Sequence, residues 1–251
     1  MKRLSLPAVV LSFVLLVALP NSARAQEPDK RAEGLLALMA ESYAELQSYA
    51  DTNTVIYRNP DGGERLHVDF KIWYVRPNEF RIDASSRSPK SVVPRREVMW
   101  TNGAAARSWA SDKPVSSAPK IKIIGSGMFG AYAYHVPTLL EESYGGAIRL
   151  NNMTAPVFVG EETVDGVRCY RIKGTWHGDP YELWLGTVDN LVRKITAKYS
   201  DHELEETHRD IVVNQDIAKE VFRFAPELEK LPSTPTPKGT PKATATPATK
   251  K

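Results

Sequence analysis

The stretch "YELWLGTVDNLVRKITAKYSDHELEETHRDIVVNQ", residues 181–215, decides how the fold is predicted. Short runs rich in β-branched and aromatic residues are separated by turn residues, which is typical of antiparallel strands joined by tight turns. The pattern predicts three consecutive strands, at 180–185, 191–199 and 203–213. The stretch contains no recognisable set of catalytic residues, so a role for this sheet has to be sought in the surfaces that it presents.

Working outward, "ERLHVDFKIWYVRP" follows the same alternation. One face carries apolar side chains and the other carries charged ones, as expected for a strand with one dry and one solvated side. The apolar face consists of Leu66, Val68, Phe70, Ile72 and Tyr74. The opposite face consists of Arg65, His67, Asp69 and Lys71.

Turn residues divide the chain into hairpins. "PDGG" at 60–63, Asn102-Gly103 and Asp165-Gly166 supply the positive φ angles that tight hairpins need. Counted from residue 52, about eleven strands follow one another, and "EVFRF" at 220–224 ends the domain with two phenylalanines on one face. The order of short turns predicts one large, meandering antiparallel sheet.

Two helices are expected to cover this sheet, which makes the predicted fold α+β. The segment that opens with Asp29 as its N-cap repeats apolar residues at helical spacing, namely Leu35, Leu36, Met39, Tyr43 and Leu46. A long insert at 112–155 predicts a short central helix with Pro137 in its first turn, Leu139, Leu140 and Tyr144 as its apolar stripe, and Gly145-Gly146 as its end. A sheet of this width curls, and with helices on its apolar face it forms an incomplete β-barrel with a hollow.

The two ends of the chain are predicted to lie outside the fold. Residues 1–25 have the basic start, apolar run and "ARA" site of a secretory signal cleaved after Ala25. A retained membrane anchor is the weaker interpretation, because Pro7 and Pro20 interrupt the run. Residues 232–251 are rich in Pro, Thr and Lys and are predicted to be disordered, either as a solubilising terminus or as a cationic spacer against an anionic surface. The half-barrel domain then spans residues 26–231.

Charge and cysteine usage exclude several classes. The formal net charge of +3 equals the contribution of Lys2, Arg3 and Arg24 in the signal, so the mature chain is formally neutral. Nucleic-acid binders normally show a basic stripe, and none is predicted here. The single cysteine, Cys169, excludes an internal disulfide, and since it lies far from the signal the protein is not expected to be a lipoprotein.

The candidate catalytic and metal-binding groups do not form complete sets. His202 and His208 lie six residues apart, about 20 Å along one strand, which is too far for a shared zinc. We therefore interpret "DHELEETHRD" as charged residues on an exposed strand. His177 and Asp179 are interpreted as a polar turn that lacks a partner, and "IIGSGMF" around Ser126 lacks the glycine spacing of a nucleophile elbow.

Two further features leave their role open. Cys169 in "VRCYRI" is expected to be a small packed side chain, and Asn152-Met153-Thr154 matters only in a host that glycosylates exported proteins. The five tryptophans are spread over the strands, where they serve equally well as core filling or as the lining of a cavity for an alkyl chain.

The last third of the chain resembles the closing strands of the outer-membrane lipoprotein carrier (LolA/LolB-like) superfamily and its uncharacterised periplasmic relatives. The features shared are Leu183-Trp184-Leu185, Asp189-Asn190, the strand Leu191 to Tyr199, Ile211 to Asn214, and Phe222-Arg223-Phe224. The opening helix, the "PDGG" hairpin and "IWYVRPNEFRIDAS" from Ile72 also resemble the start of the superfamily. The resemblance implies an unclosed barrel of about eleven strands with helices at its mouth and an apolar cavity for acyl chains.

The chain also departs from the carriers. "IGSGMFGAYAYHVPTLLEES" is similar to uncharacterised exported relatives rather than to the carrier, and the carriers' C-terminal ending is replaced by "ELEKL" and the Pro/Thr tail. No ligand-contact residue is carried over from the family.

These observations predict an exported, periplasmic, monomeric protein that is not an enzyme and needs no metal or cofactor. It is expected to bind a lipid or an acylated protein, with a membrane-associated donor or acceptor as a further partner and no nucleic acid. The predicted lining of its apolar cavity is Leu66, Val68, Phe70, Ile72, Tyr74, Phe80 and Ile82 on the sheet, with Leu139, Leu140 and Tyr144 on the central cover. The alternative is a periplasmic sensor or protein-binding module that uses the same fold without lipid transport.

Overall fold

A computed structural model describes residues 29–91, 93–118, 135–141, 144 and 149–227. The predicted signal, the predicted tail, Ser126 and Gly145-Gly146 lie outside these residues.

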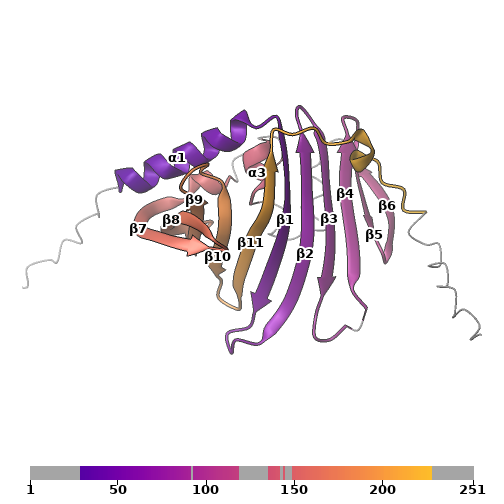
Figure 1. Ribbon diagram of the computed structural model, residues 1–251. Helices are drawn as coiled ribbons and strands as arrows, with labels where there is room; N and C mark the ends of the chain where they lie inside the picture. Colours follow the sequence, from indigo (N-terminus) through magenta and orange to yellow (C-terminus); the bar gives the residue numbers. More distant parts are fainter. Residues whose placement is uncertain (1–28, 92, 119–134, 142–143, 145–148, 228–251) are drawn as a thin grey trace, which may run out of the picture.

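The described chain forms one antiparallel sheet with eleven strands (Figure 1). The strands are β1 (Ser48–Arg58), β2 (Glu64–Val75), β3 (Glu79–Arg87), β4 (Arg95–Asn102), β5 (Ala106–Ala110), β6 (Lys113–Ala118), β7 (Thr154–Val164), β8 (Val167–Trp176), β9 (Asp179–Gly186), β10 (Val192–Lys198) and β11 (Glu203–Val213). Their order in the sheet is β6-β5-β4-β3-β2-β1-β11-β10-β9-β8-β7. The first and last strands therefore pair at the centre of the sheet.

The sheet is not closed into a barrel, because β6 and β7 lie at opposite ends of this order and do not pair with each other. Figure 1 shows β7–β10 turning away from the plane of β1–β4, so the sheet is strongly curved. This twist is the normal consequence of pairing many strands. The predicted large, curved, incomplete barrel is confirmed.

Two helices cover the sheet, as predicted. Helix α1 (Lys30–Glu45) begins at Asp29, whose Oδ1 accepts hydrogen bonds from the backbone N–H groups of Arg31 and Ala32 at 3.0 and 3.1 Å. Its other carboxylate oxygen accepts from Phe158 N in the edge strand β7 at 2.7 Å. A single side chain thus caps the helix and fixes it against the sheet, where α1 lies across the top of the molecule in Figure 1.

Helix α3 (Pro137–Leu140) is a single turn, with all four of its residues buried. It has Pro137 at its start, as the sequence indicates. The described residues also form two 3₁₀ turns, η2 (Leu150–Asn152) and η3 (Lys219–Phe222).

The core lies between the inner face of the sheet and the two helices. We use "inner face" for the side of the sheet that α1 and α3 cover. In β2 the burial follows the predicted alternation, with Val68, Phe70, Ile72 and Tyr74 buried and Lys71 exposed. One large apolar cluster contains the buried residues of this face together with those of α1 and α3.

Some boundaries differ from the sequence prediction. Helix α1 ends at Glu45 and β1 already begins at Ser48, earlier than the expected change of period. The segment "EVFRF" forms no strand: its first three residues belong to η3. Phe222 is buried, and Phe224 packs in a second cluster with Val98, Trp100 and Trp109. Of the helices in the described residues, none has both the length and the apolar character to cross a membrane.

Candidate functional site

The predicted apolar lining lies on the inner face. Strand register places Tyr74 opposite Phe80 and Ile72 opposite Ile82 on neighbouring strands. Six of the seven predicted sheet residues are at most 2% exposed, namely Val68, Phe70, Ile72, Tyr74, Phe80 and Ile82. Leu66 is half-buried and packs against the same cluster. Alternation in the sequence therefore identified a continuous apolar surface.

The three predicted residues of the central cover face this surface. We call residues 135–141 the cover. Leu139 and Leu140 are 1% exposed and belong to the same apolar cluster as β2 and β3. Beyond the cover, Tyr144 packs its ring 4.9 Å from that of Phe80. The structure thus brings all ten predicted residues to one place, between the sheet and its helices; their contact with a ligand stays a prediction.

One guanidinium joins both helices to the end of β2. Arg76 donates hydrogen bonds to the backbone oxygens of Leu46 and Ala44 at 2.7 Å and to that of Leu140 at 3.1 Å. The carbonyls at a helix C-terminus lack partners within the helix, and a cation there is favourable. Arg76 therefore ties the end of α1 and the end of α3 to the same point.

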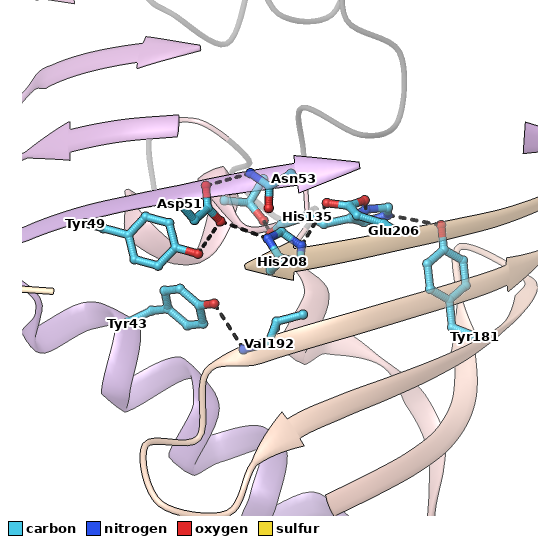
Figure 2. A network of polar contacts seen from close by, with 10 residues as sticks. Tyr43, Tyr49, Asp51, Asn53, His135, Tyr181, Val192, Glu206 and His208 are labelled. Carbon is cyan, nitrogen blue, oxygen red and sulfur yellow. Dashed lines mark hydrogen bonds and ion pairs between the residues drawn. The ribbon is translucent and has the colours of Figure 1, made fainter. Parts of the chain in front are cut away.

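A polar network interrupts the apolar inner face (Figure 2). Asp51 in β1 accepts hydrogen bonds from the Tyr49 hydroxyl at 2.5 Å and from the Asn53 amide at 2.6 Å. Its Oδ2 also lies 2.9 Å from Nδ1 of His208 in β11. The network is possible because strand register sets Asn53 directly opposite His208.

The network continues from β11 into the cover. Nε2 of His208 makes an ion-pair contact of 3.0 Å with Oε1 of Glu206, without the alignment of a hydrogen bond. Oε2 of Glu206 lies 2.5 Å from Nδ1 of His135, the first residue of the cover. Nε2 of His135 lies 3.4 Å from the Tyr181 hydroxyl, which in turn is 2.5 Å from that of Tyr199.

The geometry gives His208 a positive charge. Both ring nitrogens face carboxylate oxygens, which accept and cannot donate when ionised, so both nitrogens carry a proton. Burial alone would lower the pKa of His208, but the close contacts with the carboxylates of Asp51 and Glu206 outweigh burial and raise the pKa to about 9. His208 is therefore an imidazolium at neutral pH.

Glu206 is held in its ionised form by the same contacts. Burial acts to raise its pKa, but the two neighbouring imidazoles, His135 and His208, lower the pKa to about 2. The side chains of Glu206, His135, His208 and Asp51 are all fully buried. Buried charges of this kind persist only when they are paired.

This network corrects one sequence interpretation. We expected "DHELEETHRD" to be charged residues on an exposed strand, and for His208 this is wrong, since it is 2% exposed. Strand alternation puts Leu204, Glu206 and His208 on the inner face, while Glu205 points outward and pairs with Lys194 at 2.6 Å. In residues 203–208 the sequence marks this alternation by Leu204 alone, which does not distinguish the strand from a charged surface strand. No sequence signal singled out His135.

The tryptophans resolve an alternative that the sequence left open. Trp100 and Trp109 pack with Phe224 on the outer face. The ring of Trp184 makes cation–π contacts with Arg171 and Lys194. Trp176 is buried on the inner side, with its ring 5.4 Å from that of His135. Most tryptophans therefore stabilise the outer face instead of lining the inner one.

The remaining candidates stay apart from this site. His177 is exposed in a turn with φ of 55°, as a polar turn residue would be. Cys169 is buried in β8, and burial raises the pKa of its thiol. Within the described part of the chain, no group of three or more potential ligand side chains is arranged to hold a metal ion.

Comparison with known proteins agrees with this architecture. Residues 138–228 match a family model described as "Predicted periplasmic protein (DUF2092)". The fold is similar to the crystal structure of LprF from Mycobacterium bovis, with a TM-score of 0.50 and 12% identity over 76% of this chain and 96% of that one. No curated protein matches the sequence.

Two further solved structures are similar at lower scores. The lipoprotein LppX from Mycobacterium tuberculosis has a TM-score of 0.46 and 13% identity over 76% of this chain and 98% of that one. The LolA superfamily protein NE2245 from Nitrosomonas europaea has a TM-score of 0.37 and 10% identity over 77% of this chain and 97% of that one. At identities of 10–13% these comparisons show a likeness of fold alone.

Proposed function

We propose that this protein is exported to the periplasm, where it binds a hydrophobic ligand, a lipid or the acyl chain of a lipoprotein, between the inner face of its sheet and the cover. The observation that carries the proposal is the continuous apolar surface of β2 and β3 beneath Leu139 and Leu140, in a sheet that does not close. Burial of an acyl chain supplies the driving force, at about 0.8 kcal/mol for each methylene group.

The proposal assigns binding rather than catalysis to this surface. The ligand would enter where the cover meets the sheet, since the cover is a single helical turn whose polar contacts with the rest of the chain include those of Arg76 and His135. Insertion replaces contacts between the cover and the sheet by contacts with the alkyl chain. Both surfaces are apolar, so this exchange costs little.

A second candidate is a protein-binding module that holds no lipid. The observation that favours it is the close burial of the predicted lining, since Val68, Ile72, Tyr74, Phe80 and Ile82 are 0% exposed in contact with other side chains of this protein. A filled interior would leave the outer surface and the edges of the sheet as the places where a partner binds.

A pair of matched variants tests the first proposal. Binding of a fluorescent fatty acid is measured by titration for the wild type, for Leu139→Asn on the cover and for Leu38→Asn, which makes the same change at a position of α1 that is 46% exposed. We expect saturable binding by the wild type, at least about tenfold weaker binding by Leu139→Asn because an amide on the apolar surface is costly, and no change for Leu38→Asn.

Two outcomes would speak against lipid binding. The first is a wild type that shows no saturable binding of the probe. The second is a Leu139→Asn variant that remains folded and binds the probe as tightly as the wild type does.

A further inference from the structure

The cover meets the sheet through a charged contact that is completely buried. His135 belongs to the cover and Glu206 to β11, and both side chains are 0% exposed. An apolar pair would serve equally well if packing were the only requirement, since replacing a buried ion pair by apolar residues is often neutral or stabilising. Packing alone therefore does not account for a charged contact at this place, and we look for a further role of the contact between His135 and Glu206.

Glu206, the acceptor in this contact, depends on further charged partners. Glu206 would be expensive to bury as an ionised group if His135 were its only partner. His208 supplies a fixed positive charge next to it, and Asp51 holds His208 from the other side at 2.9 Å. The order Asp51, His208, Glu206, His135 is thus a continuous chain of close polar contacts from β1 through β11 to the cover (Figure 2).

One residue of this chain, His208, also borders a pocket at the surface. A pocket of about 340 Å³ has His208 in its wall. Its other lining residues are Val164, Asp165, Val167, Arg193, Arg209, Asp210 and Ile211. The side chain of His208 is nevertheless 0% exposed, so its ring exchanges a proton with solvent only through local opening of the fold.

We propose that Asp51, His208, Glu206 and His135 form a latch that fastens the cover to the inner face, and that loss of the His208 proton loosens it. The claim that the latch controls access of a hydrophobic ligand rests on the proposed function. The claim that the latch holds the cover is independent of it. Without the proton on His208, the carboxylates of Asp51 and Glu206 remain close together with one cation fewer. The neutral ring can donate to only one of these two carboxylates, so the burial of two negative charges is no longer offset, and the arrangement that holds Glu206 against His135 is destabilised.

The other titratable groups around the latch are buried and half-buried tyrosines and the charged residues of the pocket wall, which include Asp210. The tyrosines near it are Tyr43, Tyr49, Tyr57, Tyr181 and Tyr199, and burial raises the pKa of each, so none of them releases a proton in the range where His208 does. The charged groups in the pocket wall include Arg193, paired with Asp189, and Arg209, paired with Asp165 at 2.6 Å. His208 is therefore the group whose titration changes the charge of the latch in mildly alkaline solution.

Amide hydrogen exchange of the cover, followed by mass spectrometry at pH 7 without ligand, tests the latch. The backbone N–H groups of Leu139 and Leu140 donate to Val136 O, and that of Glu141 donates to Pro137 O, so all three report release of this turn. We expect Glu206→Gln to speed exchange in the cover about tenfold relative to β2, because a charged hydrogen bond becomes a neutral one. The matched control is Glu205→Gln, the adjacent residue of β11 on the outer face, which should leave exchange in the cover unchanged.

A pH series on the wild type provides a second test that needs no variant. After correction for intrinsic exchange, the ratio of cover exchange to β2 exchange should rise several-fold as pH passes about 9, where His208 loses its proton. The latch is refuted if this ratio stays flat through pH 9.5, or if folded Glu206→Gln exchanges its cover as slowly as Glu205→Gln does.

A separate experiment distinguishes failure of the latch from failure of the lipid-binding proposal. Release of a bound fluorescent fatty acid should accelerate by the same factor as cover exchange in Glu206→Gln. If the cover loosens while no fatty acid binds to any variant, the latch stands and the lipid-binding proposal fails. In the opposite outcome, Glu206→Gln binds fatty acid, releases it at the wild-type rate and exchanges the amides of its cover as slowly as the wild type does. The latch then fails and lipid binding stands.

Discussion

The charge on His208 predicts how the stability of the whole protein depends on pH. The pKa of His208 is about 9 in the folded protein and 6.5 in its unperturbed form. A histidine whose pKa is raised by folding stabilises the protein fully below the unfolded pKa, and this stabilisation is lost as pH rises through the folded pKa. The free energy of unfolding should therefore fall by about 1.4 kcal/mol for each pH unit in this window, or by about 3 kcal/mol between pH 6 and 9.5.

Urea unfolding monitored by circular dichroism at several pH values measures this fall. In His208→Gln the free energy of unfolding should fall by less than about 1 kcal/mol between pH 7 and 9. At pH 7 it should already be about 3 kcal/mol lower than in the wild type, since two buried carboxylates lose their cation. The control is His177→Asn at an exposed position with a left-handed backbone, which should keep the full wild-type dependence. A wild-type free energy of unfolding that stays constant between pH 6 and 9.5 would show that His208 is not charged in the fold.

Three further predictions concern the elements that build the site. Phe80→Ala should lower the free energy of unfolding by about 3–5 kcal/mol in urea titrations, because Phe80 is 0% exposed and packs on Tyr144; a cost below about 1 kcal/mol would contradict the inner-face assignment. Gly34→Ala should raise the free energy of unfolding by about 0.5–1 kcal/mol, since a Cβ at this position of α1 meets no atom within 4 Å. A lower melting temperature would contradict the helix assignment. Trp109→Ala should speed limited proteolysis after residue 218, because Phe224 packs 5.4 Å from that ring; an unchanged cleavage pattern would show that the outer cluster does not hold this segment.

Much of the fold is readable from the sequence because it rests on local signals. The alternation from Leu66 to Tyr74 and the turns at Gly62, Gly103 and Gly166 specify strands and hairpins without knowledge of the rest of the chain. These signals work because strand faces alternate and because positive φ angles favour glycine. The pairing of β1 with β11, which puts the first and last strands at the centre of the sheet, was not predicted, because it joins strands from opposite ends of the domain and no local signal reports such a contact.

The polar network could not be predicted because it depends on partners far apart in the sequence. Glu206 and His208 look like surface residues beside Glu203 and Glu205, and only their position opposite Asn53 and Val55 in the folded sheet shows that they are buried. His135 lies in an insert without a clear periodicity. Charged residues are normally exposed, so sequence reasoning assigns them to the surface unless a partner is known.

The measurement that tests lipid binding most directly is native mass spectrometry of the full chain purified from the periplasm of its own cells, followed by lipid extraction. We predict a stoichiometric complex with a lipid or acylated species, which Leu139→Asn weakens and Leu38→Asn retains. A wild-type protein recovered at its bare polypeptide mass, and still without adduct after incubation with lipids extracted from the same cells, would contradict the account and favour a protein-binding role.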